Sequence, residues 1–241
     1  MITRPTTDVV RDRRSSAEER FRAGTRVCYI PARMRYSLLV FDIDGTLADS
    51  FPWFLRHVNG VADKFGFRRI ADDDVEALRR TGPREILKRL DVPGWKLPLI
   101  ARHMRRLKAA HLDDIPLFPG VDALLQALAA HGAVMAIVSS DSEANARRAL
   151  GPDNAELITH YACGASLFGK AALFKRVLKM AGVPAESALC IGDEIRDLEA
   201  ARQAGIAFGA VSWGYASAEA LRASEPDIVF VSMEDIAGCV A

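Results

Sequence analysis

Two aspartates lie two positions apart at the end of an apolar run, in the segment Asp42-Ile-Asp44-Gly-Thr46. A carboxylate in such a place can cap a helix, bind a metal ion or act as a nucleophile. Side chains two positions apart on a strand share one face, and a turn at Gly45 ends the strand so that both carboxylates can face one ligand. One carboxylate can then attack phosphorus, while the other protonates the leaving oxygen and later takes a proton from water.

A carboxylate that attacks an anionic phosphate needs positive charge nearby, and later segments of the chain can supply it. Asp193, together with Asp42, offers the oxygen ligands that Mg²⁺ prefers. Lys170 can neutralise phosphoryl charge, and the Ser139 hydroxyl can hydrogen-bond a phosphoryl oxygen. Taken singly, Ser139 could be a helix cap, Lys170 a surface charge, and Asp193 with Asp197 acids at a helix start. Their joint order along the chain favours a shared site.

The elements that must position these side chains alternate between strands and helices. Strands are predicted over 37–42, 134–139, 158–163, 188–192, 207–211 and 228–231. Helices are predicted over 121–130, 143–150, 170–181 and 197–204, with a last turn of helix at the C-terminus. Alternation with short joins predicts an α/β fold with a doubly wound parallel sheet, similar to a Rossmann fold. Because the carboxyl ends of parallel strands converge on one edge, the candidate residues should share one pocket.

The stretch after the first strand differs, because it contains only predicted helices, over 51–65, 72–80, 84–90 and 96–112. We expect an inserted all-helical cap domain over 51–117 and a catalytic core formed by 35–50 and 118–241. The insertion holds fourteen Lys and Arg against nine acids. These cations either form solvated helix faces or attract an anionic substrate. Arg79, Arg80 and Arg84 flank a Thr-Gly-Pro break and are the best candidates to reach the pocket.

Residues 1–34 have a different composition, with eight Arg, no Lys and four acids. We expect either a disordered tail or a gene model that starts too early, with Met34 as the true start. The segment is richer in acids than a transit peptide usually is.

Bulk composition is that of an ordinary globular protein. The chain has 241 residues, half of them hydrophobic, and a net charge of +1. This charge gives no reason to expect nucleic acid or a membrane surface as a partner. The four cysteines are widely spaced, which favours free thiols over disulfides or a zinc site. No apolar run approaches the ~20 residues of a membrane helix. A cytoplasmic location is the expectation, with the oligomeric state, monomer or homodimer, left open.

Four segments of the chain resemble the sequence motifs of a known family. Leu39-Val-Phe-Asp42-Ile-Asp44-Gly-Thr46-Leu-Ala-Asp49-Ser50 is similar to the first motif, Ala136-Ile-Val-Ser139-Ser140 to the second and Leu167-Phe-Gly-Lys170 to the third. The segment from Ile191 to Ile206, which contains Asp193 and Asp197, is similar to the fourth. The chain thus resembles the haloacid dehalogenase-like hydrolase superfamily, in its phosphoglycolate phosphatase-like branch, from Met34 to about Val231.

The resemblance implies a role for each matching residue. Asp42 would be the nucleophile, and Asp44 the general acid/base whose backbone carbonyl also binds Mg²⁺. Thr46 would orient Asp44 at the phosphate-binding site, and Lys170 would bridge the phosphoryl group and Asp42.

The remaining roles concern the metal and the phosphoryl group. Asp193 would bind Mg²⁺ directly, and Asp197 would hold a magnesium-bound water or Lys170. Ser139 would bind the phosphoryl group. Ser140 stands where relatives often carry Asn, so contacts with the phosphoryl group or the nucleophile can differ at that position. Either serine could be the phosphoryl ligand if the strand ends one residue later than predicted.

The expected activity is therefore a Mg²⁺-dependent phosphatase acting on a small phosphorylated metabolite through an aspartyl-phosphate. A phosphomutase on the same scaffold is the near alternative. A dehalogenase is disfavoured, because Asp44 would have no leaving alkoxide to protonate. A phosphorylated signalling domain or a silent binding protein would belong to other classes. The long insertion and the second acid at Asp44 argue against the former, and the full catalytic set argues against the latter. Phosphoglycolate is the first substrate to consider, with nucleotides, sugar phosphates and pyrophosphate open.

Overall fold

The candidate residues are carried by a parallel sheet. The computed structural model describes residues 36–165 and 169–238. Six strands are found there, namely β1 (Leu38–Phe41), β2 (Val134–Ser139), β3 (His160–Cys163), β4 (Ala188–Gly192), β5 (Ala207–Val211) and β6 (Ile228–Phe230). They lie in the order β3-β2-β1-β4-β5-β6, and every adjacent pair is parallel. The strand order reverses beside β1, which is where doubly wound sheets bind ligands. The α/β prediction is confirmed.

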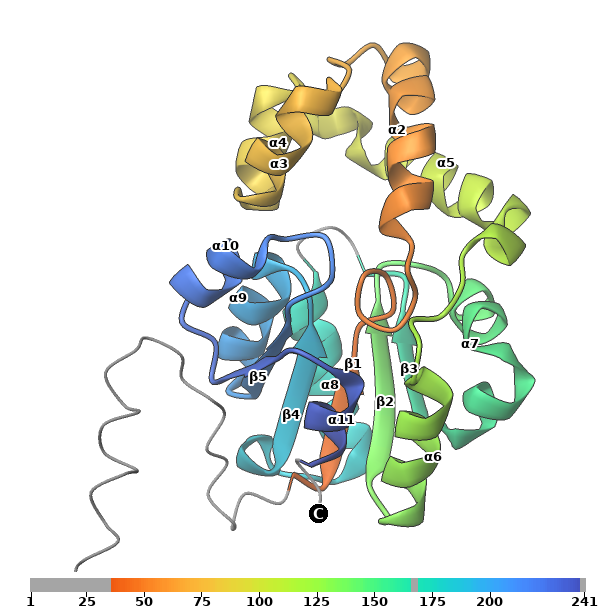
Figure 1. The fold of residues 1–241 in the computed structure, drawn as a ribbon, viewed down its shortest axis with the longest axis vertical. Helices are drawn as coiled ribbons and strands as arrows, with labels where there is room; N and C mark the ends of the chain where they lie inside the picture. Colours follow the sequence, from red (N-terminus) through yellow and green to blue (C-terminus); the bar gives the residue numbers. More distant parts are fainter. Residues whose placement is uncertain (1–35, 166–168, 239–241) are drawn as a thin grey trace, which may run out of the picture.

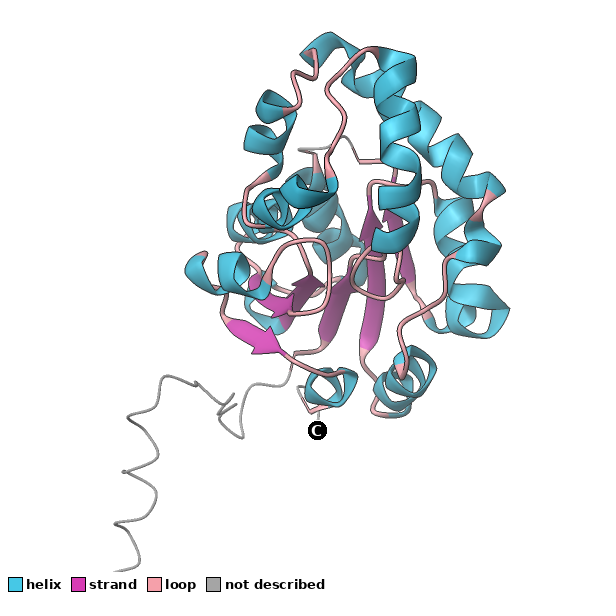
Figure 2. Cartoon of the chain, turned by 45° about the horizontal axis from the view of Figure 1, so that its top comes forward, coloured by secondary structure: helices cyan, strands magenta, loops and turns pink. Residues whose placement is uncertain are grey.

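Helices cover both faces of this sheet (Figure 2). The hydrophobic cluster on one face includes residues of α6 (Val121–Ala130), α7 (Glu143–Leu157) and α11 (Met233–Ala237), and that on the other includes residues of α8 (Lys170–Ala181), α9 (Ile195–Ala204) and α10 (Ala218–Ala223). In β1, Leu39 and Phe41 enter the first cluster, whereas Leu38 and Val40 enter the second. This two-sided burial explains the unbroken apolar run before Asp42.

A helical insertion connects β1 to α6 and lies beyond the carboxyl edge of the sheet (Figure 1). Its elements are α2 (Phe51–Phe65), η2 (Asp72–Asp74), α3 (Val75–Arg79), α4 (Pro83–Arg89), η3 (Gly94–Lys96), α5 (Leu97–Ala110) and η4 (Leu112–Asp114). The insertion has a small core of its own, formed by Val58, Ile70, Leu78 and Leu90. Trp53 of α2 instead joins the core on the sheet. The predicted all-helical insertion is thus present.

Most predicted elements match the structure to within a few residues, but three differ. The helix predicted over 143–150 ends where expected, because the backbone leaves the helical region at Gly151; a second helical segment, which was not predicted, begins at Pro152 and carries α7 on to Leu157. α9 begins at Ile195, two residues earlier than predicted. α10 was not predicted, because six residues with one apolar contact, Leu221, give little periodicity to detect.

Several predictions fall outside the described residues. These are the tail 1–34, Cys28 and Cys239, and the first two residues of the third motif, Leu167 and Phe168. Within the described ranges, Cys163 and Cys190 are free thiols. Among the helices described there, we find none with the length and apolarity that a bilayer crossing requires.

Candidate active site

Asp42 emerges directly from the central strand. β1 ends at Phe41, and the Asp42 amide still donates to the Ile191 carbonyl of β4 at 3.0 Å. The Asp42 side chain is 5% exposed, and its Oδ1 accepts a 2.8 Å hydrogen bond from the Ile43 amide. The sheet therefore holds one carboxylate oxygen in place and leaves the other for a partner.

That partner is Lys170, the first residue of α8. Its Nζ lies 2.6 Å from Asp42 Oδ2 and 2.7 Å from Asp197 Oδ1. The Lys170 side chain is only 3% exposed, and the Asp197 side chain 1%. A buried ammonium between two buried carboxylates balances charge that would otherwise be costly to desolvate. The structure thus brings together three predicted residues from β1, α8 and α9.

Asp193, between β4 and α9, is held on both carboxylate oxygens. Oδ1 accepts from the Thr46 hydroxyl at 3.0 Å, and Oδ2 accepts from the Tyr215 amide at 2.7 Å. The Thr46 hydroxyl therefore contacts Asp193, whereas we expected it to orient Asp44. Glycine is required at two neighbouring positions, because a Cβ at Gly45 (φ +75°) or Gly214 would overlap the Asp193 side chain.

The buried acids also form a set suited to a metal ion. One carboxylate oxygen from each of Asp42, Asp193 and Asp197 lies within 4.8 Å of the others. Asp197 Oδ2 is buried and has no hydrogen-bond donor among the described residues. Clustered carboxylates with spare oxygen lone pairs fit a hard divalent cation. Asp44, which we expected to contribute its backbone carbonyl, is not one of these three side chains.

Burial and neighbouring charges shift the pKa values of Asp42, Asp193 and Lys170. Burial raises the pKa of Asp42 to about 6, although the Lys170 ammonium acts in the opposite direction. Burial, together with the charges of Glu194 and Asp42, raises the pKa of Asp193 well above its ordinary value. Burial lowers the pKa of Lys170, but the charges of Asp197 and Asp42 outweigh it and raise the pKa overall. Lys170 is therefore a fixed cation.

Asp44 has a partner that the sequence analysis missed. Lys108 of α5 places its Nζ 2.6 Å from Asp44 Oδ1 and 2.8 Å from Oδ2. The same Nζ lies 2.9 Å from Asp141 Oδ2, and the Asn145 side-chain amide donates to Asp141 Oδ1 at 2.8 Å. Burial favours the neutral form of Asp44, but the charge and hydrogen bonds of Lys108 outweigh it and lower the pKa of Asp44. A lysine of the insertion therefore holds the expected acid/base.

The sequence does contain a weak signal for Lys108. Leu97, Ile100, Met104 and Lys108 recur at spacings of three and four residues, so they lie on one face of α5. All four line the same cavity. A lysine on the apolar face of a helix is expected to be buried, whereas most of the fourteen cations in the insertion do not continue an apolar face.

The two serines at the end of β2 have different surroundings. Ser139 is 1% exposed, and its Oγ accepts from the Asp141 amide at 3.1 Å. Ser140 lines the cavity, and its carbonyl accepts from Arg105 at 3.1 Å. Which of the two binds a phosphoryl group stays a prediction. Arg84 lies on an exposed position of α4, and among the three arginines near the Thr81–Pro83 break Arg79 is the one that lines the cavity.

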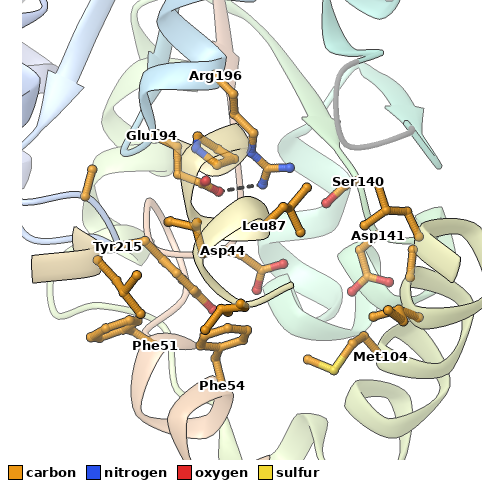
Figure 3. Close-up of a pocket in the computed structure, with 18 of the residues that line it drawn as sticks. Asp44, Phe51, Phe54, Leu87, Met104, Ser140, Asp141, Glu194, Arg196 and Tyr215 are labelled. Carbon is orange, nitrogen blue, oxygen red and sulfur yellow. Dashed lines mark hydrogen bonds and ion pairs between the residues drawn. The ribbon is translucent and has the colours of Figure 1, made fainter. Parts of the chain in front are cut away.

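A cavity of about 750 Å³ separates the insertion from the sheet edge. Figure 3 shows Asp44 between Phe51 and Tyr215 on one side and Asp141 on the other. The cavity lining also includes Ser140 and Glu194, each adjacent in sequence to a residue of the proposed site. The cavity therefore ends next to the buried cluster formed by Asp42, Lys170, Asp193 and Asp197.

The structure is a doubly wound α/β fold in which a buried lysine and three buried aspartates converge at the switch point of the sheet. A family model described as haloacid dehalogenase-like hydrolase matches residues 39–211. This range includes every site residue predicted from the sequence. The chain belongs to the haloacid dehalogenase-like hydrolase family.

Curated relatives include phosphatases. The chain is 31% identical over 199 residues to a phosphoglycolate phosphatase of Synechococcus elongatus, covering 82% of this chain and 94% of that protein. It is 28% identical over 216 residues to a 5'-nucleotidase of Pseudomonas aeruginosa, covering 81% and 91%. The enzyme is thus a hydrolase of the phosphoglycolate phosphatase-like branch.

Solved structures agree on the fold. A haloacid dehalogenase-like family hydrolase from Streptococcus pneumoniae aligns with a TM-score of 0.67 at 21% identity, covering 84% of this chain and 97% of the other. CbbY from Rhodobacter sphaeroides, in complex with phosphate, aligns with a TM-score of 0.65 at 22% identity, covering 83% and 96%. These similarities show the fold of the sheet with its helical insertion.

Proposed function

We propose that this enzyme is a Mg²⁺-dependent phosphatase that hydrolyses a small phosphate monoester through an aspartyl-phosphate. The observation that carries the proposal is the contact of Lys170 with Asp42 beside Asp193 and Asp197. It joins a carboxylate nucleophile, a fixed cation and a candidate metal site within one buried cluster. A bound Mg²⁺ would supply charge neutralisation to the phosphoryl oxygens.

The chain's own residues then divide the reaction. A carboxylate oxygen of Asp42 attacks phosphorus, and the bond from phosphorus to the alcohol oxygen breaks. The ion pair with Lys108 favours the carboxylate form of Asp44, so Asp44 must take up a proton before this step. It then gives that proton to the alcohol oxygen and becomes a carboxylate. Asp44 next takes a proton from water, whose oxygen attacks the phosphorus of the aspartyl-phosphate. Orthophosphate leaves, and Asp42 is again a carboxylate.

Three other groups support these steps in the proposal. Lys170 neutralises charge on the phosphoryl group and Asp42, and Ser139 or Ser140 donates a hydrogen bond to a phosphoryl oxygen. Lys108 positions Asp44, because it contacts both of that residue's oxygens. Thr46 acts on the site through Asp193.

The domain division supports the same function. We propose that residues 35–50 and 118–241 form the catalytic core and that residues 51–117 form a cap over the sheet edge. Closure of such a cap would exclude water before phosphoryl transfer. Phosphoglycolate is a candidate substrate because curated relatives carry that name. We also propose that the enzyme works in the cytoplasm, which the distribution of a fluorescent fusion would test.

The test is turnover of p-nitrophenyl phosphate by the purified chain with Mg²⁺, and its loss after chelation. In Asp42→Asn we expect kcat/KM to fall by about 10⁴-fold, because the nucleophile is removed. Asp49→Asn is the matched control in the same motif. Full activity of Asp42→Asn would contradict the proposal.

The same assay separates the alternatives. A phosphomutase would return the phosphoryl group to a bound sugar, so isotope-labelled phosphate would appear on sugar rather than as orthophosphate. A signalling domain would become labelled once and release no further product.

A further inference from the structure

The cavity in front of Asp44 is much larger than a two-carbon leaving group requires. Its volume of about 750 Å³ lies within the ~300–1,000 Å³ range of pockets that enclose drug-sized ligands. We propose that the phosphate monoester hydrolysed here has a bulky apolar alcohol, an alkyl chain of several carbons or an aromatic ring, which fills the insertion side of this cavity. The inference rests on the proposed function and names the class of its leaving group.

The cavity is polar at the sheet edge and mostly apolar on the side of the insertion. Asp44, Ser140 and Glu194 line it at the edge of the sheet, next to the buried cluster. The insertion contributes the cations Arg79, Arg105 and Lys108, but most of its lining side chains are apolar, among them Leu55, Ile70, Leu78, Ile86, Leu87 and Met104. A monoester whose phosphate enters the cluster must place its alcohol toward these side chains. The lining therefore matches an amphiphilic substrate, polar at the phosphate and apolar beyond it.

Aromatic rings form one wall of the cavity. Phe51 and Phe54 of α2 contact Tyr215, with ring centroids 4.9 and 5.6 Å from the tyrosine ring (Figure 3). The hydroxyl of Tyr215 lies 3.1 Å from the Ser50 hydroxyl. The rings are thus fixed by each other and by this hydrogen bond, and they offer a preformed apolar surface.

The cations of the described lining are already engaged by protein oxygens. These cations are Arg79, Arg105, Lys108 and Arg196. Arg79 donates to the carbonyls of Gly214 and Tyr215, each at 3.0 Å. Arg105 donates to the Ser140 carbonyl, Lys108 contacts Asp44 and Asp141, and Arg196 pairs with Glu194. Arg79, Lys108 and Arg196 are already paired with acids, so among the four cations of the described lining Arg105, which contacts a carbonyl, has the most capacity left for a carboxylate on the leaving group. An apolar group needs none of them.

The experiment compares methyl, butyl and hexyl phosphate with 2-phosphoglycolate on the full chain with Mg²⁺. The alkyl esters differ little in leaving-group reactivity, so a rise in kcat/KM along the series reports binding of the chain. We expect kcat/KM to rise by about fourfold for each methylene that becomes fully buried. Phosphoglycolate should fall below butyl phosphate.

Failure of this inference and failure of the proposed function give different results. If the alkyl esters are hydrolysed with no dependence on chain length, or phosphoglycolate is the best of the four, the apolar substrate class is wrong and the phosphatase stands. If no ester, including p-nitrophenyl phosphate, is hydrolysed, the proposed function itself is overturned, and this inference with it.

A pair of variants places the effect in the cavity. Leu87 lines the cavity from α4, whereas Leu99 of α5 is 40% exposed and is not part of the lining. We expect Leu87→Gln to lower kcat/KM for hexyl phosphate by about tenfold, since it removes the equivalent of one buried apolar side chain. Methyl phosphate should be unaffected, and Leu99→Gln should change neither. Equal losses for both esters in Leu87→Gln, with an unchanged melting temperature, would overturn the inference.

Discussion

Two buried lysines each lie between two aspartates, but they belong to different parts of the molecule. Lys170 contacts Asp42 at 2.6 Å and Asp197 at 2.7 Å. Lys108 contacts Asp44 at 2.6 Å and Asp141 at 2.9 Å. Their side chains are 3% and 7% exposed. The local chemistry of the two ion-pair clusters is therefore nearly the same.

Their anchoring differs. Lys170 begins α8, which packs on the sheet together with α9, so the lysine and its partners share one hydrophobic core. Lys108 belongs to α5 of the insertion, while both of its partners lie in loops at the edge of the sheet. The Lys170 cluster lies within the sheet and the helices packed on it, whereas the Lys108 cluster joins the insertion to the sheet edge and so depends on the position of the insertion. The ion pairs of Lys170 can thus form whatever the position of the insertion, whereas those of Lys108 form only when the insertion lies against the sheet edge.

The largest effect should come from breaking the Lys170 cluster. In Lys170→Met the buried carboxylates of Asp42 and Asp197 lose their cation, and the phosphoryl group loses a stabilising charge. We expect kcat/KM to fall by about 10³-fold, equally for p-nitrophenyl phosphate and for hexyl phosphate. The exposed Lys175 of the same helix provides the control, Lys175→Met. Steady-state kinetics at saturating Mg²⁺ measure both, and a loss confined to one ester would contradict the assigned role.

Breaking the second cluster should give a loss that depends on the leaving group. Lys108→Met leaves Asp44 unanchored, and general acid catalysis contributes about 10²-fold or more to expulsion of a poor leaving group. We therefore expect kcat/KM for hexyl phosphate to fall by about 10²-fold. p-Nitrophenolate leaves without protonation, so p-nitrophenyl phosphate should lose only a few-fold.

Two further variants test whether Lys108 acts through Asp44. Lys108→Arg keeps the charge and should recover part of the activity toward hexyl phosphate. Lys88→Met, at an exposed position of α4, controls for loss of a cation from the insertion. Equal losses for both esters in Lys108→Met would show that the residue serves folding alone, and circular dichroism melting would reveal such a defect.

The difference between the two lysine clusters also explains which site residues could be predicted from the sequence. Asp42, Ser139, Asp193 and Lys170 each follow or end a predicted strand or begin a helix at the sheet edge, and parallel strands bring such positions together in any fold of this class. Their convergence could be predicted without knowing a single side-chain contact.

Residues set by packing between the insertion and the sheet could not be predicted in this way. Lys108 and Asp44 are 64 residues apart, and their contact depends on the angle at which α5 crosses the sheet edge. Arg79 contacts the Gly214 and Tyr215 carbonyls more than 130 residues away. Thr46 contacts Asp193 rather than Asp44 because of how the loop after Gly45 turns. Local periodicity records which face of a helix is buried but not which partner it meets.

The smallest effect should come from Asp141, which contacts Lys108 without touching Asp44. Its Oδ1 accepts from the Ser142 amide at 2.7 Å and from Asn145 at 2.8 Å, so Asp141→Asn should keep its place and lose mainly its charge. We expect kcat/KM for hexyl phosphate to fall, but by less than the about 10²-fold expected for Lys108→Met, because Lys108 keeps both contacts with Asp44. p-Nitrophenyl phosphate should not change.

A double-mutant cycle tests whether this small effect of Asp141 is exerted through Lys108. If Asp141 acts only by holding Lys108, then Asp141→Asn should have no further effect in the Lys108→Met background, because the contact is already lost. Losses that multiply would mean that the Asp141 side chain serves the site by another route, for example through the Ser142 amide and the Asn145 side chain that its Oδ1 contacts. No such coupling is expected between Asp141→Asn and Lys170→Met, because the two clusters share no residue.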